Sequence, residues 1–347
     1  MRALVKYETG PGNVEIRDVP PPALGPGQVL IDVAHAAVCG TDRLAVEGAH
    51  DFGTSRTLGH EASGVVAALG EGLARDDLRV GDRVTVETDA YLCLACEYCR
   101  REEYNRCPYR LGIGTTTDGA LADQLVMPER AVHVLPDSVS LLDGALTEPL
   151  AIAVHAVIEQ GPSLAGQVVV VVGPGAIGQL CAQVAHAVGA TVVLVGRSRH
   201  AETLASARAF GIPVTVDAET EELDEVVRSL TGGYGAHTVF ECSGAAGVVE
   251  SSLPLLRRGG RLVLVAFFRE DPHIDVETVI NREIEIVGSR GKRPSSYRTA
   301  LRLMEAGSVD VGRLISSRLP LERWRDGLDL VATGRKVVFD IAGPARA

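Results

Sequence analysis

Aromatic residues are scarce in this chain of 347 residues, and it has no excess of basic residues. Phe, Trp and Tyr make up 4% of the sequence, so few large rings are available to wall an apolar pocket. The formal net charge of −11 argues against nucleic acid or an anionic membrane as a partner, because both favour basic surfaces. The apolar fraction of 46% and the charged fraction of 23% are those of an ordinary globular protein.

Long uninterrupted apolar runs are also missing. The most apolar stretch, residues 168–195, is broken by several glycines and by Pro174, which indicates two strands around a helix and not a membrane span. The first twelve residues show no basic head followed by an apolar core, so we expect no signal peptide. These patterns predict a cytoplasmic protein with no membrane partner.

Cysteines are few, but four of the seven are clustered. Their spacing is C-x2-C-x2-C-x7-C, formed by Cys93, Cys96, Cys99 and Cys107. Without an export signal, such clustering favours a metal over disulfides. Four thiolates complete a tetrahedral zinc site and leave no position for a substrate, so the expected role is structural. Free thiols or a redox pair are the alternatives.

Three sections of the chain differ in their residue pattern. Residues 1–150 are rich in Gly and Pro and carry short β-type runs such as 28–33, which predicts an irregular, barrel-like β domain. From about 150 to 287, apolar runs such as 168–172 alternate with helical stretches, the pattern of a doubly wound parallel sheet. A closing β segment at 336–341 is expected to return to the first domain. The predicted fold class is α/β.

A glycine-rich loop follows the apolar run at 168–172 and opens a helix. It has the form G-x-G-x-x-G and consists of Gly173, Pro174, Gly175, Ala176, Ile177 and Gly178. The first glycine allows a tight turn, the second lets the backbone approach a pyrophosphate, and the third lets the helix sit close to the strand. Three glycines can simply form a turn, but the strand–turn–helix context favours a dinucleotide site.

The end of the next apolar run favours NADP over NAD. An NAD site usually has an acidic residue here to bind the ribose hydroxyls. This chain instead reads Gly196, Arg197, Ser198 and Arg199. Arginine pairs well with a 2′-phosphate, so NADP is the expected cofactor. The alternative is a solvated basic loop without a ligand.

A second set of metal donors comes from separated segments. Cys39 lies in the run VCGTD, His60 in GHE and Glu148 in EPL. A thiolate, an imidazole and a carboxylate leave one position open for water or an alcohol, as a catalytic zinc requires. Taken alone, such a cysteine is more often a small core residue, and such a histidine is more often a polar residue whose hydrogen bonds are made within the protein. Together, and beside the other two motifs, they favour a catalytic site and two zinc ions per chain.

The chain resembles the zinc-containing medium-chain dehydrogenase/reductases, especially the sorbitol, threonine and glucose dehydrogenase branches. The resemblance runs nearly end to end and rests on the segments VCGTD, GHEASGVV, GDRV, the four-cysteine loop, EPLAIAVHA, VVGPGAIG, ECSG and GSRG. It implies a GroES-like catalytic domain at 1–150 and 289–347, with a Rossmann domain at 151–288. It also implies a homo-oligomer, a dimer or a tetramer.

The resemblance assigns roles in the catalytic zinc site. Cys39 and His60 match zinc ligands. Glu61 matches a carboxylate that either ligates the zinc or stands just behind it. Glu148 matches a further ligand, direct or through water, where classical alcohol dehydrogenases use cysteine. Which of the two carboxylates binds zinc directly stays open.

The resemblance also assigns the residues that orient the imidazole and accept the proton of the substrate alcohol. Asp42 matches the residue that orients the His60 imidazole. Thr41 matches the hydroxyl that accepts the proton of the substrate alcohol. Leu44 stands where classical alcohol dehydrogenases place a histidine that passes this proton to solvent, so the exit route is open.

Two further segments carry weaker expectations. Cys242 and Ser243, in the ECSG run, are expected to shape the cofactor pocket. The run Lys292-Arg293-Pro294 is similar to the sugar-contacting segment of the glucose dehydrogenases, and a surface turn is the alternative.

The expected reaction is hydride transfer between NADP, or NAD, and a secondary alcohol. A carboxylate ligand and scarce aromatic residues favour a polyol, sugar or cyclitol over an apolar alcohol. An amino alcohol, as in threonine dehydrogenases, is the alternative substrate. A catalytically silent NADP-binding protein is the alternative outside enzymes, and the intact Cys39, Thr41, His60 and Glu148 argue against it. The exact substrate and the physiological direction stay open.

Overall fold

The computed structural model describes residues 1–49 and 55–342. The chain divides into two compact units. Unit 1 consists of Met1–Pro149, Arg293–Glu305 and the segment that begins at Val311, whereas unit 2 consists of Leu150–Lys292 and Ala306–Asp310. Among the described residues, no helix is long and apolar enough to cross a membrane.

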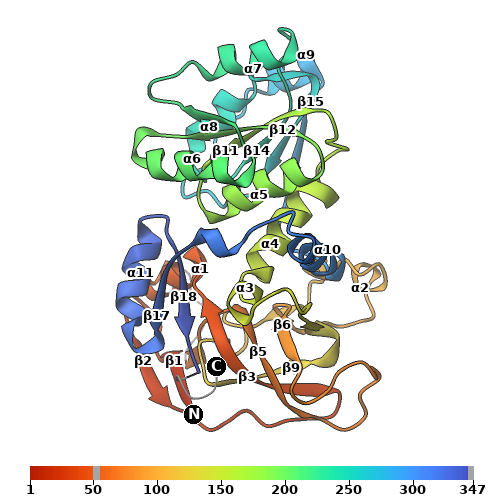
Figure 1. Ribbon diagram of the computed structural model, residues 1–347, viewed down its shortest axis with the longest axis vertical. Coiled ribbons are helices and arrows are strands. Elements are labelled where there is room, and N and C mark those ends of the chain that lie inside the picture. The colour runs from red at the N-terminus through yellow and green to blue at the C-terminus, as the bar shows by residue number, and fades with distance from the viewer. Residues whose placement is uncertain (50–54, 343–347) are drawn as a thin grey trace. The chain divides into compact units, whose positions relative to one another are not determined.

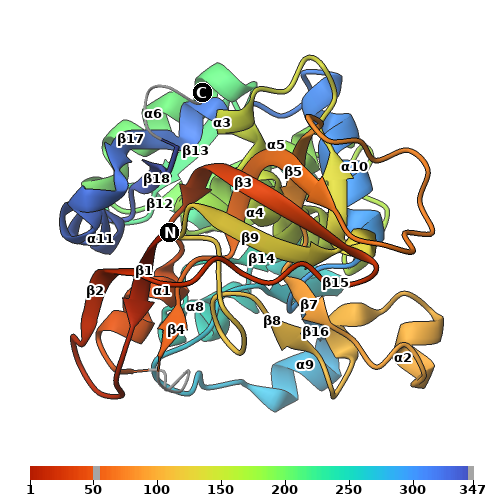
Figure 2. The same ribbon diagram turned by 90° about the horizontal axis from the view of Figure 1, so that it is seen from below.

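Unit 1 is built on a seven-stranded sheet in the order β10-β6-β5-β3-β18-β17, with β9 also paired to β3. These strands are β3 (Gln28–Ala37), β5 (Glu61–Leu69), β6 (Arg83–Val86), β9 (Gln124–Pro128), β10 (Val132–Val134), β17 (Ile315–Pro320) and β18 (Lys336–Asp340). The long strand β3 lies between β5 and β9 (Figure 2). It runs four residues past the expected 28–33: all four are buried, and His35, Ala36 and Ala37 pair with both β5 and β18. The closing strand β18 pairs with β3, which confirms the expected return of the chain.

The remaining elements of unit 1 are short. Two small sheets hold β2-β1-β4 and β7-β8, formed by β1 (Arg2–Lys6), β2 (Val14–Asp18), β4 (Arg56–Thr57), β7 (Asp89–Tyr91) and β8 (Leu111–Gly112). The helices are α1 (Gly40–Val46), α2 (Glu97–Arg100), α3 (Leu141–Gly144), α10 (Pro294–Glu305) and α11 (Trp324–Ala332). Helix α4 (Thr147–Val154) begins in unit 1 and ends in unit 2. Trp324 and Leu328 of α11 join the core beneath β18, beside which α11 lies (Figure 2).

Unit 2 is a six-stranded sheet in the order β13-β12-β11-β14-β15-β16, and all five pairings are parallel. Its strands are β11 (Val168–Val172), β12 (Thr191–Gly196), β13 (Val214–Asp217), β14 (Ala236–Glu241), β15 (Leu256–Leu264) and β16 (Glu285–Gly288). Val169, Val170 and Val171 of β11 are fully buried, as expected of a central parallel strand covered on both faces. The predicted α/β class, with a β-rich domain and a doubly wound parallel sheet, is confirmed.

Helices surround the sheet of unit 2 (Figure 1). They are α5 (Ala176–Ala187), α6 (Ala201–Ala207), α7 (Leu223–Thr231), α8 (Ala246–Ser252) and α9 (Val276–Arg282). Helix α5 contacts β11 and β12, and its residues Leu180, Cys181 and Val184 are completely buried. Strand order reverses beside β11, and in doubly wound sheets ligands bind outside the carboxyl ends of the strands at such a point.

Candidate active site

Strand pairing in unit 1 brings three predicted metal donors together. Strands β3 and β5 are antiparallel, with Ala37 opposite Glu61, so the end of one strand meets the start of the other. Cys39 follows β3 and caps α1, while His60 directly precedes β5 and Glu61 is the first residue of that strand. One sulfur, one imidazole nitrogen and one carboxylate oxygen of these three residues lie within 4.8 Å of one another. This mixed donor set fits a zinc ion with an open position.

Asp42 ties the two donor segments to each other. One carboxylate oxygen accepts the backbone N–H of Cys39 at 2.9 Å, and the other accepts that of Gly59 at 3.1 Å. The His60 Nδ1 atom is 3.6 Å from the same carboxylate. Burial on its own raises the pKa of Asp42, but His60 and the two amides outweigh burial and hold that pKa below its ordinary value. The resulting negative charge is well placed to orient the imidazole.

Glu61 has a buried cationic partner, Lys336, the first residue of β18. The Lys336 ammonium donates to the Glu61 carboxylate and, at 3.2 Å, to the carbonyl of Val38. Glu61 is 1% exposed and Lys336 6%. Burial raises the pKa of Glu61, Glu148 adds to that shift, and Lys336 opposes it. Lys336 therefore supplies the positive charge that a buried carboxylate needs.

The other predicted residues lie around this group. The Thr41 hydroxyl is 3.5 Å from the Cys39 sulfur, in the first turn of α1. Leu44 lies on the same helix. Glu148 is buried in the first turn of α4 and lies outside the group of mutually close donors, although its charge acts on both Glu61 and Lys336. Of the two predicted carboxylates, only Glu61 therefore belongs to the donor group.

The four predicted structural ligands form a separate cluster. The sulfur atoms of Cys93, Cys96, Cys99 and Cys107 lie within 4.8 Å of one another. Backbone amides of Cys96 and Cys99 donate to the sulfurs of Cys93 and Cys96, both at 3.4 Å. The backbone amides of Ala95 and Cys96 lower the pKa of Cys93 to about 6, while burial raises that of Cys99 to about 12. Four clustered cysteine sulfurs are the donor set of a closed, tetrahedral metal site, and zinc fits them.

The glycine loop of unit 2 has the shape that a pyrophosphate requires. Gly173 has φ = +100°, and a Cβ there would lie 2.8 Å from the backbone of Ser243. A Cβ on Gly178 would lie 1.8 Å from the carbonyl oxygen of Gly173, whereas one on Gly175 would meet nothing within 4 Å. The open space above Gly175 and the close packing at the other two glycines fit a dinucleotide.

The predicted neighbours of this loop are close to it. The backbone of Cys242 and Ser243 lies within 2.9 Å of a Cβ built on Gly173, and the Cys242 N–H donates to Val172 at 2.9 Å. A Cβ on Gly196 would lie 3.0 Å from the ring of Pro174. The ends of β11, β12 and β14 therefore form one edge around the loop.

Two carboxylates at this edge are not predicted by the residues that follow β12. Asp217 ends β13, and Glu219 follows it. Both accept hydrogen bonds from Ser198. The signal available was an acidic run, D-A-E, directly after the neighbouring apolar strand.

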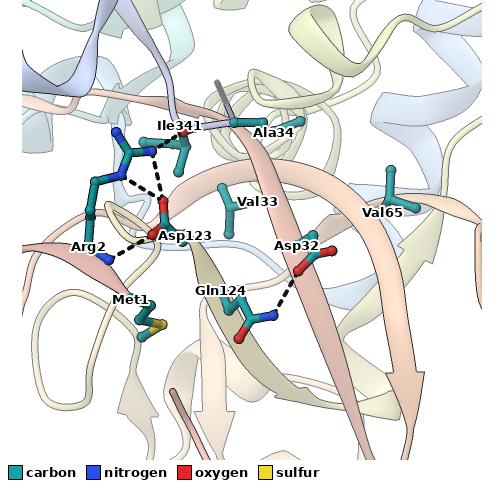
Figure 3. Close-up of a pocket in the computed structure, with 10 residues that line it drawn as sticks. Met1, Arg2, Asp32, Val33, Ala34, Val65, Asp123, Gln124 and Ile341 are labelled. Atoms are coloured by element: carbon teal, nitrogen blue, oxygen red, sulfur yellow. Dashed lines mark hydrogen bonds and ion pairs between the residues drawn. The ribbon is translucent and has the colours of Figure 1, made fainter. Parts of the chain in front are cut away.

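A pocket of about 600 Å³ lies elsewhere in unit 1 and contains none of these donors (Figure 3). The charged side chains that line this pocket form hydrogen bonds with other residues of the chain. Arg2 Nη2 donates to Asp123 at 2.9 Å, and Gln124 Nε2 donates to Asp32 at 2.8 Å. The donor group around Cys39 is therefore separate from this pocket.

Comparison with known proteins decides the family. Residues 25–137 match the alcohol dehydrogenase GroES-like domain, and residues 176–306 match the zinc-binding dehydrogenase domain. A D-arabitol-phosphate dehydrogenase from Enterococcus avium is 36% identical over 97% of this chain and 96% of its own length. The chain belongs to the zinc-containing medium-chain alcohol dehydrogenase family.

Two further zinc-dependent dehydrogenases are similar to this chain over nearly its whole length. A sorbitol dehydrogenase from Halalkalibacterium halodurans is 37% identical over 97% of this chain and 98% of its own length. A zinc-binding dehydrogenase from Sinorhizobium meliloti, solved bound to NADP, is 30% identical with a TM-score of 0.89 and covers 98% of each chain. The chain is thus a zinc-dependent dehydrogenase of the alcohol and polyol class.

Proposed function

We propose that this enzyme transfers a hydride between NADP, its preferred cofactor, and a secondary alcohol of a polyol, sugar or cyclitol. The observation that supports this proposal most strongly is that Cys39, His60 and Glu61 have donor atoms within 4.8 Å of one another. The sorbitol and arabitol-phosphate dehydrogenases among its relatives support a polyol substrate. The two domain matches support a GroES-like domain at 1–150 and 289–347 and a Rossmann domain at 151–288. The family resemblance adds a cytoplasmic dimer or tetramer to the proposal.

In this proposal Cys39, His60 and Glu61 hold the catalytic zinc, and Glu148 contributes through a water molecule. Glu61 fits the direct role because its carboxylate lies in the donor group, whereas Glu148 does not. Bound zinc supplies Lewis-acid polarisation of the alcohol oxygen. Asp42 holds the imidazole in the orientation that leaves its other nitrogen for the metal.

Thr41 is the proposed acceptor of the alcohol proton. Its hydroxyl lies 3.5 Å from the Cys39 sulfur, so an alcohol bound to a metal held by Cys39 would be close to it. Leu44 offers no relay beyond it, so the proton leaves Thr41 through another group or water.

The four-cysteine loop is proposed to hold a second, structural zinc, so that the two ions have separable roles. Replacing Cys39 by serine should remove about one zinc per chain and leave the melting temperature nearly unchanged. Replacing Cys96 by serine should also remove about one zinc but lower the melting temperature, because the thiolates would repel one another in a loop no longer held by the metal. Metal analysis and thermal unfolding of both variants provide the measurement. Equal destabilisation, or a single zinc in the wild type, contradicts this assignment.

The NADP preference is supported by Arg197 and Arg199, which form no ion pair among the residues that the structure describes, and by the NADP-bound relative. A charge-assisted hydrogen bond contributes roughly 1.5–3 kcal/mol, which corresponds to a preference of ~10- to 100-fold. We expect kcat/KM to be higher with NADP than with NAD in the wild type, and the ratio to fall in Arg197→Ala or Arg199→Ala. A wild type that prefers NAD overturns the preference. An unchanged ratio in both variants shows that other residues carry it.

A further inference from the structure

The segment after β13 occupies the hydrogen-bonding groups of Ser198. Strands β12 and β13 are parallel, with Gly196 opposite Asp217, so the residues after each strand meet at one edge of the sheet. The Ser198 hydroxyl donates to Asp217 at 2.6 Å, and the Ser198 backbone N–H donates to Glu219 at 3.1 Å. The carboxylates of a neighbouring strand therefore lie where the family's usual acid on β12 is missing.

Asp217 holds this arrangement together. Its second carboxylate oxygen accepts the backbone N–H of Glu219 at 3.0 Å, which fixes the path of the chain toward Ser198. Its own N–H donates to Glu221 at 2.8 Å. The Ser198 hydroxyl and the Glu219 amide lower the pKa of Asp217, so this carboxylate is charged at neutral pH. Asp217 thus acts as a positioning residue, and Glu219 is the acid that it places.

Glu219 is the more easily displaced of the two acids. It is exposed and reaches Ser198 through a single hydrogen bond, to the backbone N–H. Arg197 and Arg199 lie on either side of Ser198. A 2′-phosphate that pairs with either arginine would approach the same amide, and two anions cannot share one N–H without repulsion.

We infer that Glu219 sets how strongly this enzyme distinguishes NADP from NAD. Its carboxylate stays on the Ser198 amide when NAD binds, where it can accept a ribose hydroxyl. It has to leave when the 2′-phosphate of NADP binds. The inference rests on the proposed cofactor site. It adds an acid that opposes the effect of the arginines, so it predicts that the wild type uses both cofactors, with a smaller NADP preference than the arginines alone would give.

Nucleotide binding without catalysis tests this inference. The probes are 2′,5′-ADP, which carries the 2′-phosphate, and 5′-AMP, which lacks it, and their dissociation constants are measured by titration calorimetry. Glu219→Gln should tighten 2′,5′-ADP by ~10-fold and change 5′-AMP by less than ~3-fold, because the glutamine side chain can still accept from the Ser198 amide but no longer repels the phosphate. The tightening should shrink as ionic strength rises.

Glu222→Gln is the matched control, since it removes the same charge from an exposed position in the same segment. It should change the affinity ratio of the two nucleotides by less than ~2-fold. An equal ratio change in Glu222→Gln and Glu219→Gln, or equal tightening of both nucleotides by Glu219→Gln, overturns the role of Glu219. A wild type that binds 5′-AMP more tightly contradicts the NADP preference alone, because the change caused by Glu219→Gln is still measured. If the wild type binds neither nucleotide, the proposed cofactor site is wrong, and so is the inference that rests on it.

Discussion

Replacing Thr41 by valine should lower turnover by ~10²–10⁴-fold, the usual range for a positioned acid–base group. Valine keeps the shape of the side chain and removes only the hydroxyl that lies 3.5 Å from the Cys39 sulfur. Zinc content and nucleotide affinity should stay nearly unchanged, because Thr41 is not among the metal donors. Steady-state kinetics, metal analysis and nucleotide titration on one preparation give all three quantities.

Thr41→Ser is the matched control for this variant. Serine keeps the hydroxyl, so turnover should fall by less than ~10-fold. If Thr41→Val turns over as fast as the wild type, another group or a water molecule accepts the alcohol proton, and the assigned role is wrong.

Replacing Lys336 by methionine should destabilise the zinc-free protein by about 3–5 kcal/mol, the cost of leaving a buried carboxylate without its partner. The pair is almost fully buried, so solvent screens it little. The measurement is urea unfolding of unit 1, followed through its single tryptophan, Trp324. With zinc bound, the loss should be smaller, because a cation beside Glu61 replaces the missing ammonium.

The double variant Glu61→Gln/Lys336→Met separates the charge effect from lost packing. It removes both charges, so it should be more stable than Lys336→Met alone in the zinc-free state. A Lys336→Met protein whose unfolding midpoint equals that of the wild type would mean that Glu61 is protonated or otherwise compensated. The ion pair would then contribute nothing to the site.

Motifs with fixed local spacing could be predicted from the sequence. The four cysteines and the glycine loop each lie within one short segment, so their geometry follows from chain length and backbone conformation alone. The apolar runs of unit 2 gave the strands, because a central parallel strand such as Val168–Val172 is continuously apolar.

Residues that meet only through strand register could not be predicted. Lys336 is 275 residues from Glu61 and reaches it because β18 and β5 both pair with β3. Glu219 reaches Ser198 because β13 pairs with β12 in one particular register. Periodicity identifies strands but not which strands become neighbours. A lysine at the start of a strand and an acid after one have no local signature.

The most direct test of the account is zinc-dependent oxidation of polyols. The purified enzyme is stripped with a chelator, reloaded with Zn²⁺ and assayed for NADPH formation with a panel of polyols, sugars and cyclitols, alongside Cys39→Ser. We predict activity in the reloaded wild type, none in the stripped enzyme and none in Cys39→Ser after reloading. Turnover that persists without zinc, or in reloaded Cys39→Ser, would contradict a catalytic zinc held by Cys39, His60 and Glu61.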